Sequence, residues 1–315
     1  MSIGIHFGID TSNYTTSAAA ISDAGEVFYA KRLLSVPQGN RGMRQSDALF
    51  CHTRDLAEVC RECLEKVKAS KGEFHLRSVG VSRTPRRREG SYMPCFLAGV
   101  NAASVAASLS GVELFEFSHQ EGHLEAARQG ALSLGYGTLG SRFLAFHLSG
   151  GTCELVLAEE DEAGYRTEIV AETLDLTCGQ LIDRCGVALG LSFPSGKELE
   201  ALAQQSTKRC RIRIPTRGKG INLSGFENRF TAAIGESEPC DIAAFVFDVV
   251  EAACRAMLEI AGEEELPVLF SGGVSSSVIL RERFSGERYH FAPADYAADN
   301  AIGIAYLARK GAKDE

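Results

Sequence analysis

The stretch IHFGIDTS, residues 5–12, decides the fold that we expect for this chain. It starts as a mostly apolar strand and ends in the polar residues Asp10, Thr11 and Ser12. A second apolar strand is expected at 17–21. Backbone amides and hydroxyls in a turn between such strands can bind phosphate, and an acidic residue at the strand end can hold a metal ion or a water. A plain β-hairpin is the alternative, and this stretch alone favours it.

The same unit recurs twice further along the chain. Residues 143–148 form an expected strand that meets the turn SGGT at 149–152, and residues 267–270 meet the turn SGGVS at 271–275. Glycines in these turns allow positive φ angles and let the backbone approach a ligand closely. Three such turns, each after an apolar strand, predict a duplicated α/β protein with a nucleotide between its halves. This arrangement is typical of actin-like ATPases.

Length and composition set limits on the organisation of the chain. With 315 residues, 45% of them hydrophobic, it can bury a large core and is expected to form two domains, residues 1–131 and 132–315. We find neither a signal peptide nor an apolar run of about 18 residues, so we expect a cytoplasmic protein without membrane contact. A net charge of -8 argues against bulk polyanion binding but is compatible with a local basic patch.

Several stretches predict helices, and the cysteines predict no disulfide framework. Helices are expected at 46–69, 96–109, 241–261 and 300–307. Cys60 and Cys63 form a CxxC pair inside the first of these helices, without a second pair at zinc-ribbon spacing. We therefore expect ordinary helix cysteines there, and free thiols for the ten cysteines of the chain.

Two histidines four residues apart are the first candidate for metal binding. His119 and His123 follow an expected strand at 112–117, and on a helix the i and i+4 positions lie on one face. Ser118 is an expected N-cap, with Glu121 three residues later as in a capping box. Neutral imidazoles bind zinc, iron and similar divalent ions, but the site then needs a third ligand from elsewhere. Two surface histidines on an amphipathic helix are the alternative.

Two basic runs stand out in this acidic chain. One is RTPRRREG at 83–90, after an expected strand at 78–82, and the other is KRCRIRI at 208–214, with Arg217 and Lys219 soon after it. Both runs are compatible with a surface that contacts the phosphates of a nucleic acid. The alternatives are a solvated loop for the first run and an edge strand with a solvated basic face for the second.

Further short motifs occur in order along the chain. They are GIDTS at 8–12, HQEGH at 119–123, SGG at 149–151, ETLD at 172–175 with Gly179 and Asp183 after it, PSG at 194–196, LSG at 223–225, SGGV at 271–274 and ADN at 298–300. Over nearly the whole chain they resemble the TsaD family of tRNA threonylcarbamoyltransferases, formerly described as glycoproteases. The ordered set is far more specific than any single motif.

The resemblance implies a fold, an activity and partners. The fold is the two-lobed, duplicated actin-like fold of sugar kinases and heat-shock proteins. The reaction moves a threonylcarbamoyl group from its adenylate to the adenosine next to the anticodon of tRNA. Because this donor is already activated, no nucleophilic side chain is needed. The implied partners are tRNA and other threonylcarbamoylation proteins.

The resemblance also implies a site. It contains one divalent metal ion, iron or zinc with magnesium as a third candidate, bound by His119, His123 and Asp299, and no catalytic residue beyond the metal site. It also binds an adenine nucleotide or adenylate as substrate. The implied nucleotide contacts are Asp10, Thr11, Ser12, Leu148, Ser149, Gly150, Gly151, Thr152, Asp183, Gly196, Gly272, Gly273 and Ser277.

The chain departs from the family pattern near the expected adenylate or acyl group. Basic residues at 83–94 replace a Gly-Pro-Gly loop, Thr152 replaces a histidine, and Ser277 replaces an asparagine. A carbamoyl-type transferase with another acceptor and a non-catalytic partner subunit are therefore kept as alternatives, although the retained metal ligands argue against the second. A metalloprotease is disfavoured, because Gln120 stands where a zincin carries its glutamate.

Overall fold

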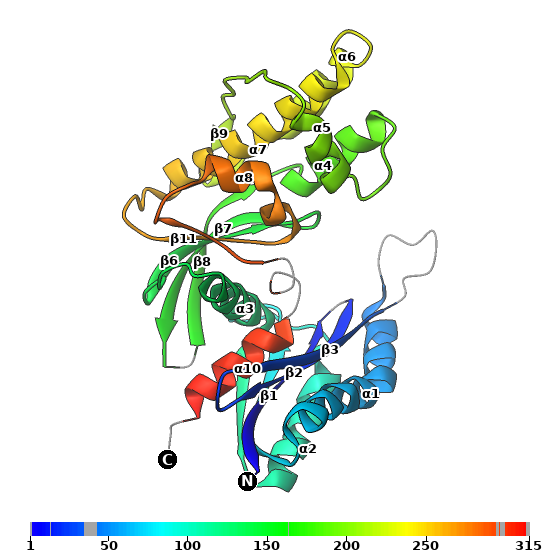
Figure 1. Cartoon of the computed structure of the whole chain (residues 1–315), viewed down its shortest axis with the longest axis vertical. Helices are drawn as coiled ribbons and strands as arrows, with labels where there is room; N and C mark the ends of the chain where they lie inside the picture. Colours follow the sequence, from blue (N-terminus) through cyan, green and yellow to red (C-terminus); the bar gives the residue numbers. More distant parts are fainter. Residues whose placement is uncertain are drawn as a thin grey trace. The chain divides into compact units, whose positions relative to one another are not determined.

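The computed structural model describes residues 2–12, 14–34, 43–162, 164–293, 296 and 300–312. The chain groups into two compact units: Met1–Gln129 with Glu160–Arg166 and Ala298–Glu315, and Gly130–Glu159 with Thr167–Ala297. Each unit contains a β-sheet with helices packed on it, which confirms the expected α/β class (Figure 1). The lobes predicted from the sequence, 1–131 and 132–315, remain a prediction.

The sheet of the first unit has the strand order β3-β2-β1-β4-β5. Its strands are β1 (Ile3–Ser12), β2 (Thr15–Ser22), β3 (Val27–Leu33), β4 (Phe74–Thr84) and β5 (Glu113–Ser118). β1 pairs antiparallel with β2 and parallel with β4, and β4 pairs parallel with β5. The pairing of β1 with β2 continues to Ser12, so residues 10–12 belong to the strand and the turn is shorter than expected.

Helices pack on both faces of this sheet. They are α1 (Gln45–Lys71), α2 (Phe96–Ser110) and α10 (Asn300–Gly311). Helix α3 (His119–Ser133) follows β5 and contacts α10, and its residues from Gly130 onwards belong to the second unit. Successive residues of a strand point to opposite faces. A Cβ on Gly8 would lie 2.6 Å from the Ala305 nitrogen of α10, whereas the next residue, Ile9, lies against Gly99 of α2. Gly8 thus lets α10 pack directly on the backbone of β1.

The sheet of the second unit has the strand order β12-β11-β6-β7-β8-β10-β9. Its strands are β6 (Arg142–Leu148), β7 (Cys153–Asp161), β8 (Gly164–Thr173), β9 (Thr216–Arg217), β10 (Gly220–Ile221), β11 (Val268–Ser271) and β12 (Tyr289–Phe291). β6 pairs antiparallel with β7 and parallel with β11. Because β6 and β11 run in the same direction, the two Gly-Gly turns that follow them lie at the same edge of the sheet.

Helix α7 is the centre of the second unit. The helices are α4 (Cys178–Ala188), α5 (Gly196–Ala203), α6 (Ser224–Ala233), α7 (Pro239–Ala261) and α8 (Val278–Arg283), with a 3-10 helix at Gly273–Ser276. Pro239 stands in the first turn of α7, and Gly262 ends the helix with a φ of 66°, the usual positions of these residues. α7 contacts α4, α5, α6 and α8, which explains its many buried apolar residues.

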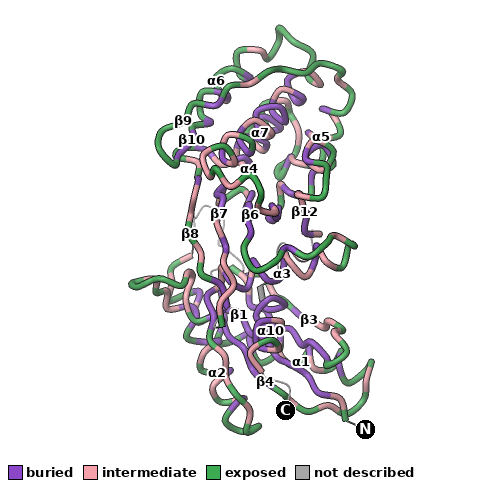
Figure 2. Tube along the Cα trace, turned by 90° about the vertical axis from the view of Figure 1, so that its left-hand side faces the viewer, coloured by how far each residue is buried: buried purple, intermediate pink, exposed green. Residues whose placement is uncertain are grey.

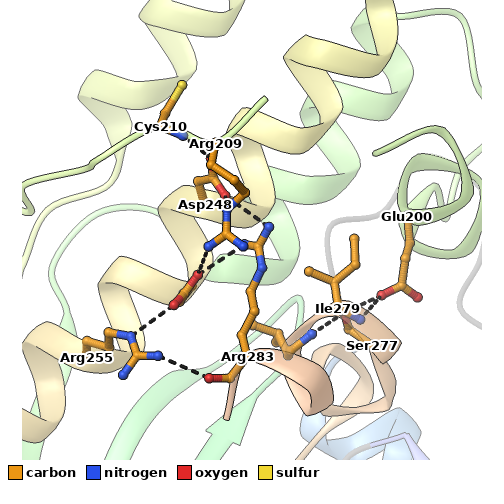
Figure 3. Close-up of polar contacts among 10 residues, drawn as sticks. Glu200, Arg209, Cys210, Asp248, Arg255, Ser277, Ile279 and Arg283 are labelled. Carbon is orange, nitrogen blue, oxygen red and sulfur yellow. Dashed lines mark hydrogen bonds and ion pairs between the residues drawn. The ribbon is translucent and has the colours of Figure 1, made fainter. Parts of the chain in front are cut away.

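The basic run at 208–214 forms no strand, so the edge-strand interpretation is wrong. The Cys210 N–H donates to the carboxylate of Asp248 on α7 at 2.6 Å. Arg209 forms ion pairs with Asp248 at 2.9 Å and with Glu251 at 2.7 Å (Figure 3). The backbone of the run therefore bonds to a buried side chain instead of a neighbouring strand.

Other expectations from the sequence are confirmed. The four predicted helices are present as α1, α2, α7 and α10, with ends that differ by a few residues. The ten cysteines are free thiols, and the CxxC pair lies within α1. In the part of the chain that the structure describes, no helix is long and apolar enough to cross a membrane.

Candidate active site

The histidine pair lies on the first turns of α3, directly after β5. The predicted capping box is present, because the Glu121 carboxylate accepts hydrogen bonds from the N–H and the hydroxyl of Ser118, each at 2.7 Å. The Glu121 N–H donates in return to the Ser118 hydroxyl at 3.3 Å. The ring centroids of His119 and His123 are 4.7 Å apart. The helix therefore brings the two imidazoles to one place.

Asp10, near the end of β1, contacts Nδ1 of His119 and so fixes the tautomer of the neutral imidazole. Its Oδ1 lies 3.0 Å from Nδ1 of His119, and the carboxyl is 1% exposed. Burial alone would raise the pKa of Asp10, but the charge and hydrogen bond of His119, with further hydrogen bonds, hold it at about 2. An ionised carboxylate only accepts, so Nδ1 donates, and in the neutral form of this imidazole the lone pair is on Nε2, as in the carboxylate–histidine pairs of metal sites.

The two glutamates of α3 are engaged in other contacts. Glu121 also accepts from the Tyr165 N–H at 2.9 Å. Glu125 accepts from the Tyr165 hydroxyl and, at 2.7 Å, from Gln129. Both carboxylates and Tyr165 are buried. These bonds attach the start of β8 to the histidine helix, which the sequence did not indicate, and they occupy the carboxylates of the two glutamates on that helix.

A close contact between α3 and α10 lies beside the histidines. A Cβ on Gly303 would be 2.8 Å from the carbonyl carbon of Gly122, which stands between the two histidines, and 2.7 Å from the Ala126 nitrogen. Asp299, the third predicted ligand, directly precedes α10 in sequence but lies outside the described residues. Within the described ranges, no group of three or more His, Cys, Asp or Glu side chains is placed to hold a metal ion. The three-ligand site therefore stays a prediction.

The turn after β6 is closed by hydrogen bonds and contacts α4. The Ser149 N–H donates to the Thr152 carbonyl at 2.8 Å, and the Thr152 N–H donates to the Ser149 hydroxyl at 2.9 Å. The Thr177 hydroxyl, at the N-cap of α4, donates to the Gly150 carbonyl at 3.0 Å. Gly179 allows this close approach, because a Cβ there would lie 2.6 Å from the Gly150 nitrogen.

A cavity of about 560 Å³ opens beside this turn within the second unit. Its lining brings together residues that the sequence predicted as nucleotide contacts, namely Ser149, Gly150, Asp183, Gly196, Gly273 and Ser277. Lys197, Glu200 and Phe247 also line it and were not predicted. The volume lies within the range of small-molecule sites. The cavity therefore collects groups from the turns after β6 and β11 and from the start of α5.

Other predicted nucleotide contacts lie elsewhere. Leu148 is fully buried, and Gly272 packs against it, since a Cβ on Gly272 would lie 2.8 Å from the Leu148 carbonyl carbon. Gly151 and Thr152 belong to the turn after β6 but do not line the cavity. The three residues at the end of β1 belong to the first unit; they are Asp10, Thr11 and Ser12.

Glu200 holds the turn that carries Ser277. The Ser277 hydroxyl donates to the Glu200 carboxylate, which also accepts from the Ile279 N–H at 3.0 Å (Figure 3). The same hydroxyl accepts from the Leu280 N–H at 3.2 Å and caps α8. Asp183 is also fixed, because it accepts from the Ser195 N–H at 2.8 Å. The carboxylates of Glu200 and Asp183 therefore hold the backbone of the cavity wall in place.

The first basic run is attached to the histidine helix. The Gln120 N–H donates to the Pro85 carbonyl at 3.1 Å. Arg87 lies 2.9 Å from Asp161, and Arg83 forms an ion pair with Glu116. Two of the arginines that the sequence offered for phosphate binding are therefore neutralised by carboxylates.

Comparisons with known proteins identify relatives over most of the chain. A family model for TsaD, described as tRNA N6-adenosine threonylcarbamoyltransferase, matches residues 34–306. A protein of Methanopyrus kandleri named tRNA N6-adenosine threonylcarbamoyltransferase is 25% identical, over 95% of this chain and 85% of its own length. A probable bifunctional tRNA threonylcarbamoyladenosine biosynthesis protein of Thermoplasma acidophilum is 26% identical over 96% of this chain, which spans only 55% of that protein.

Solved structures confirm the actin-like fold. The crystal structure of T. kodakarensis HypF has a TM-score of 0.56 at 13% identity, with coverage of 99% of this chain and 48% of that chain. A ROK family transcriptional regulator has a TM-score of 0.50 at 11% identity, with coverage of 98% and 79%. At these identities the likeness concerns the fold alone.

Proposed function

The chain belongs to the TsaD family of acyltransferases, and we propose that it transfers a threonylcarbamoyl group from an adenylate to the adenosine next to the anticodon of tRNA. In this reaction the exocyclic amine of the adenosine attacks the carbamoyl carbonyl carbon. A new N–C bond forms, the bond from that carbon to the phosphate oxygen breaks, the amine loses a proton, and AMP leaves. The observation that carries this proposal is the cavity that collects six predicted nucleotide contacts.

The AMP part of the donor binds in that cavity. Lys197 is the cation of its lining and is available for the phosphate, while Asp183 is an acceptor for a ribose hydroxyl. Gly150 and Gly273 expose backbone without a side chain, since a Cβ on either glycine would meet open space. These features suit a phosphate-linked nucleoside better than a purely apolar ligand.

His119 and His123, together with Asp299, would hold one divalent ion. The donor set of two imidazoles and one carboxylate suits iron or zinc. The bond between Asp10 and Nδ1 of His119 supports this role, because a carboxylate on one ring nitrogen fixes the tautomer and the orientation of an imidazole whose other nitrogen coordinates a metal. When bound, such an ion would polarise the carbamoyl carbonyl. Further threonylcarbamoylation proteins, which would supply the adenylate, are the partners that we propose.

A reconstituted transfer reaction tests the function. The purified chain, transcribed tRNA and threonylcarbamoyl adenylate would be mixed, with and without candidate partner proteins, and tRNA nucleosides analysed by mass spectrometry. We expect threonylcarbamoyladenosine with the wild type and with the control His75→Ala, an exposed histidine of β4. We expect none with His119→Ala/His123→Ala, and elemental analysis should show the metal lost from that variant alone. Full transfer by the double variant would refute the metal proposal, and an unmodified tRNA in every mixture would refute the acceptor.

Calorimetric titration with AMP tests the cavity separately. Lys197→Ala should weaken AMP binding roughly tenfold, about 1.4 kcal/mol, through loss of a charged hydrogen bond. Gly273→Val should abolish it by filling the open space. Gly225→Ala, a glycine of α6 with equally open space but outside this lining, is the control. Unchanged AMP affinity in Lys197→Ala and Gly273→Val would contradict this site. Gly272 is unsuitable for such a test, because its variants would clash with Leu148.

A further inference from the structure

The basic segment between α5 and β10 contains paired and unpaired cations. Lys208 lies 2.6 Å from Asp241, Lys219 lies 2.7 Å from Glu168, and Arg209 is bound to Asp248 and Glu251. The other cations of the segment are exposed and have no acidic partner among the described residues; they are Arg211, Arg213 and Arg217. The sequence gives no means of telling these six cations apart, whereas in the structure three of them are paired with carboxylates and three are not.

The structure fixes this segment and directs the free arginines outward. Ile214 is buried and Ile212 is half-buried, so the alternate positions Arg211 and Arg213 face solvent. In an extended chain such positions are about 6.6 Å apart. Residue 210 is bonded to Asp248 of α7 through its N–H, as Figure 3 shows, so the segment is anchored where the arginines begin. The chain leading to β9 is largely exposed (Figure 2).

The second anchor lies after the arginine pair. The Asn222 N–H donates to the Pro215 carbonyl at 3.1 Å, and Arg217 belongs to β9, where it pairs with Gly220 of β10. The three arginines therefore stand on a backbone held at both ends, although the segment before β9 has no regular secondary structure. Less entropy is then lost when they bind a ligand.

We propose that Arg211, Arg213 and Arg217 bind backbone phosphates of the tRNA substrate, an inference that rests on the proposed function for the identity of the RNA. Guanidinium groups match phosphate oxygens with paired N–H donors. On a chain with a net charge of -8, three adjacent unpaired cations are a local exception that attracts a polyanion.

The composition of the segment favours an RNA stem over other anionic partners. Residues 206–221, all described, contain no aromatic side chain on which unstacked bases could stack. They also expose no large hydrophobic side chain of the kind that anchors proteins on membranes. Contacts to phosphates alone position a nucleic acid without reading its sequence. This surface would therefore hold the tRNA body while the anticodon region reaches the site.

The salt dependence of tRNA binding tests this surface. Affinity for a tRNA transcript would be measured by fluorescence anisotropy at several salt concentrations for wild type and for Arg211→Ala/Arg213→Ala/Arg217→Ala. The slope of log affinity against log salt should fall by roughly one unit per lost phosphate contact, about two to three units in total. The control is Arg142→Ala/Lys208→Ala/Lys219→Ala, which removes three charges that are paired with carboxylates of the second unit. Its slope should change by less than one unit.

The results of these titrations and of the transfer assay show whether the phosphate-binding surface or the proposed transfer to tRNA is wrong. Transfer to tRNA together with an unchanged slope in the arginine variant would overturn the surface alone, as would an equal fall in the control. No salt-dependent tRNA binding by the wild type would overturn both the surface and the proposed acceptor. An unchanged tRNA slope with lost binding to phosphatidylserine vesicles would assign the arginines to membranes and overturn the inference.

Discussion

Replacing Gly303 by alanine tests the packing of α10 against the histidine helix. The new Cβ would lie 2.7 Å from the Ala126 nitrogen and 2.8 Å from the Gly122 carbonyl carbon, with the Gly122 oxygen closer still. Ordinary contact begins at 3.4 Å, so backbone atoms of two helices must separate. Overpacking of this kind costs about 1–3 kcal/mol, and the higher helix propensity of alanine returns up to about 1 kcal/mol.

We expect Gly303→Ala to lower the free energy of unfolding by about 1–2 kcal/mol. The overpacking cost should lie in the upper part of its range, because the groups that must move are backbone atoms. For a chain of 315 residues the Tm should fall by roughly 1.5–3 °C. Thermal unfolding followed by circular dichroism measures this change. Since α10 directly follows Asp299, we also expect the variant to bind iron or zinc more weakly than the wild type, as measured by titration against a chelator.

Gly225→Ala is the matched control, because it makes the same change in helix α6, where a Cβ meets open space. It should leave the Tm unchanged or raise it slightly. A Gly303→Ala protein as stable as the wild type would refute the packing argument. A destabilised protein with unchanged metal affinity would keep the packing but refute a metal site shared by α3 and the residue before α10.

Three further perturbations have expected outcomes. Asp248→Ala should lower the free energy of unfolding in urea by about 1–3 kcal/mol, because it removes the closer of the two carboxylates paired with the largely buried Arg283 and leaves Glu251 at 3.3 Å; a loss under about 0.5 kcal/mol would contradict this. Asp10 has a pKa of about 2 in the folded chain against an ordinary 3.8, so it adds stability above pH 4 that is lost as pH falls towards 2. Asp10→Asn should flatten stability in that window, and an unchanged pH profile would show that Asp10 is not so perturbed. Glu200→Ala should weaken AMP binding several-fold by releasing Ser277 and the N-terminus of α8; equal AMP affinity would exclude this positioning role.

The periodic parts of the fold could be predicted from the sequence. Helix α7 carries apolar residues on most sides and has proline and glycine at its ends, and each of these signals is local. The histidine pair and its capping box are also local, since they lie within six residues of one helix start. The position of strand β1 is predicted correctly, but the strand is longer than predicted. Its pairing with β2 continues through the polar residues 10–12.

The partners of charged residues could not be predicted. Arg209 is paired with Asp248, and Arg87 with Asp161, across 39 and 74 positions of the chain. Only the fold decides which arginine of a run meets a carboxylate. For this reason the sequence leaves an edge strand and a phosphate-binding surface as alternatives for the run at 208–214, and it offers all the arginines at 83–88 for phosphate binding. The contact of Glu125 with Tyr165 was missed for the same reason.

The Gly-Gly pair after β11 combines two physical requirements, chain packing and an open cavity wall, that the sequence does not distinguish. Gly272 has a φ of 89° and its missing Cβ makes room for Leu148, so this position serves chain packing. Gly273, the next residue, faces the cavity with open space, as does Gly150 of the other turn. A substitution at Gly272 would therefore lower stability whether or not a nucleotide binds, whereas one at Gly273 changes only what the cavity can hold. In the turn after β11, therefore, Gly273 is the glycine that the proposed ligand site uses, whereas Gly272 is needed for the packing of the chain.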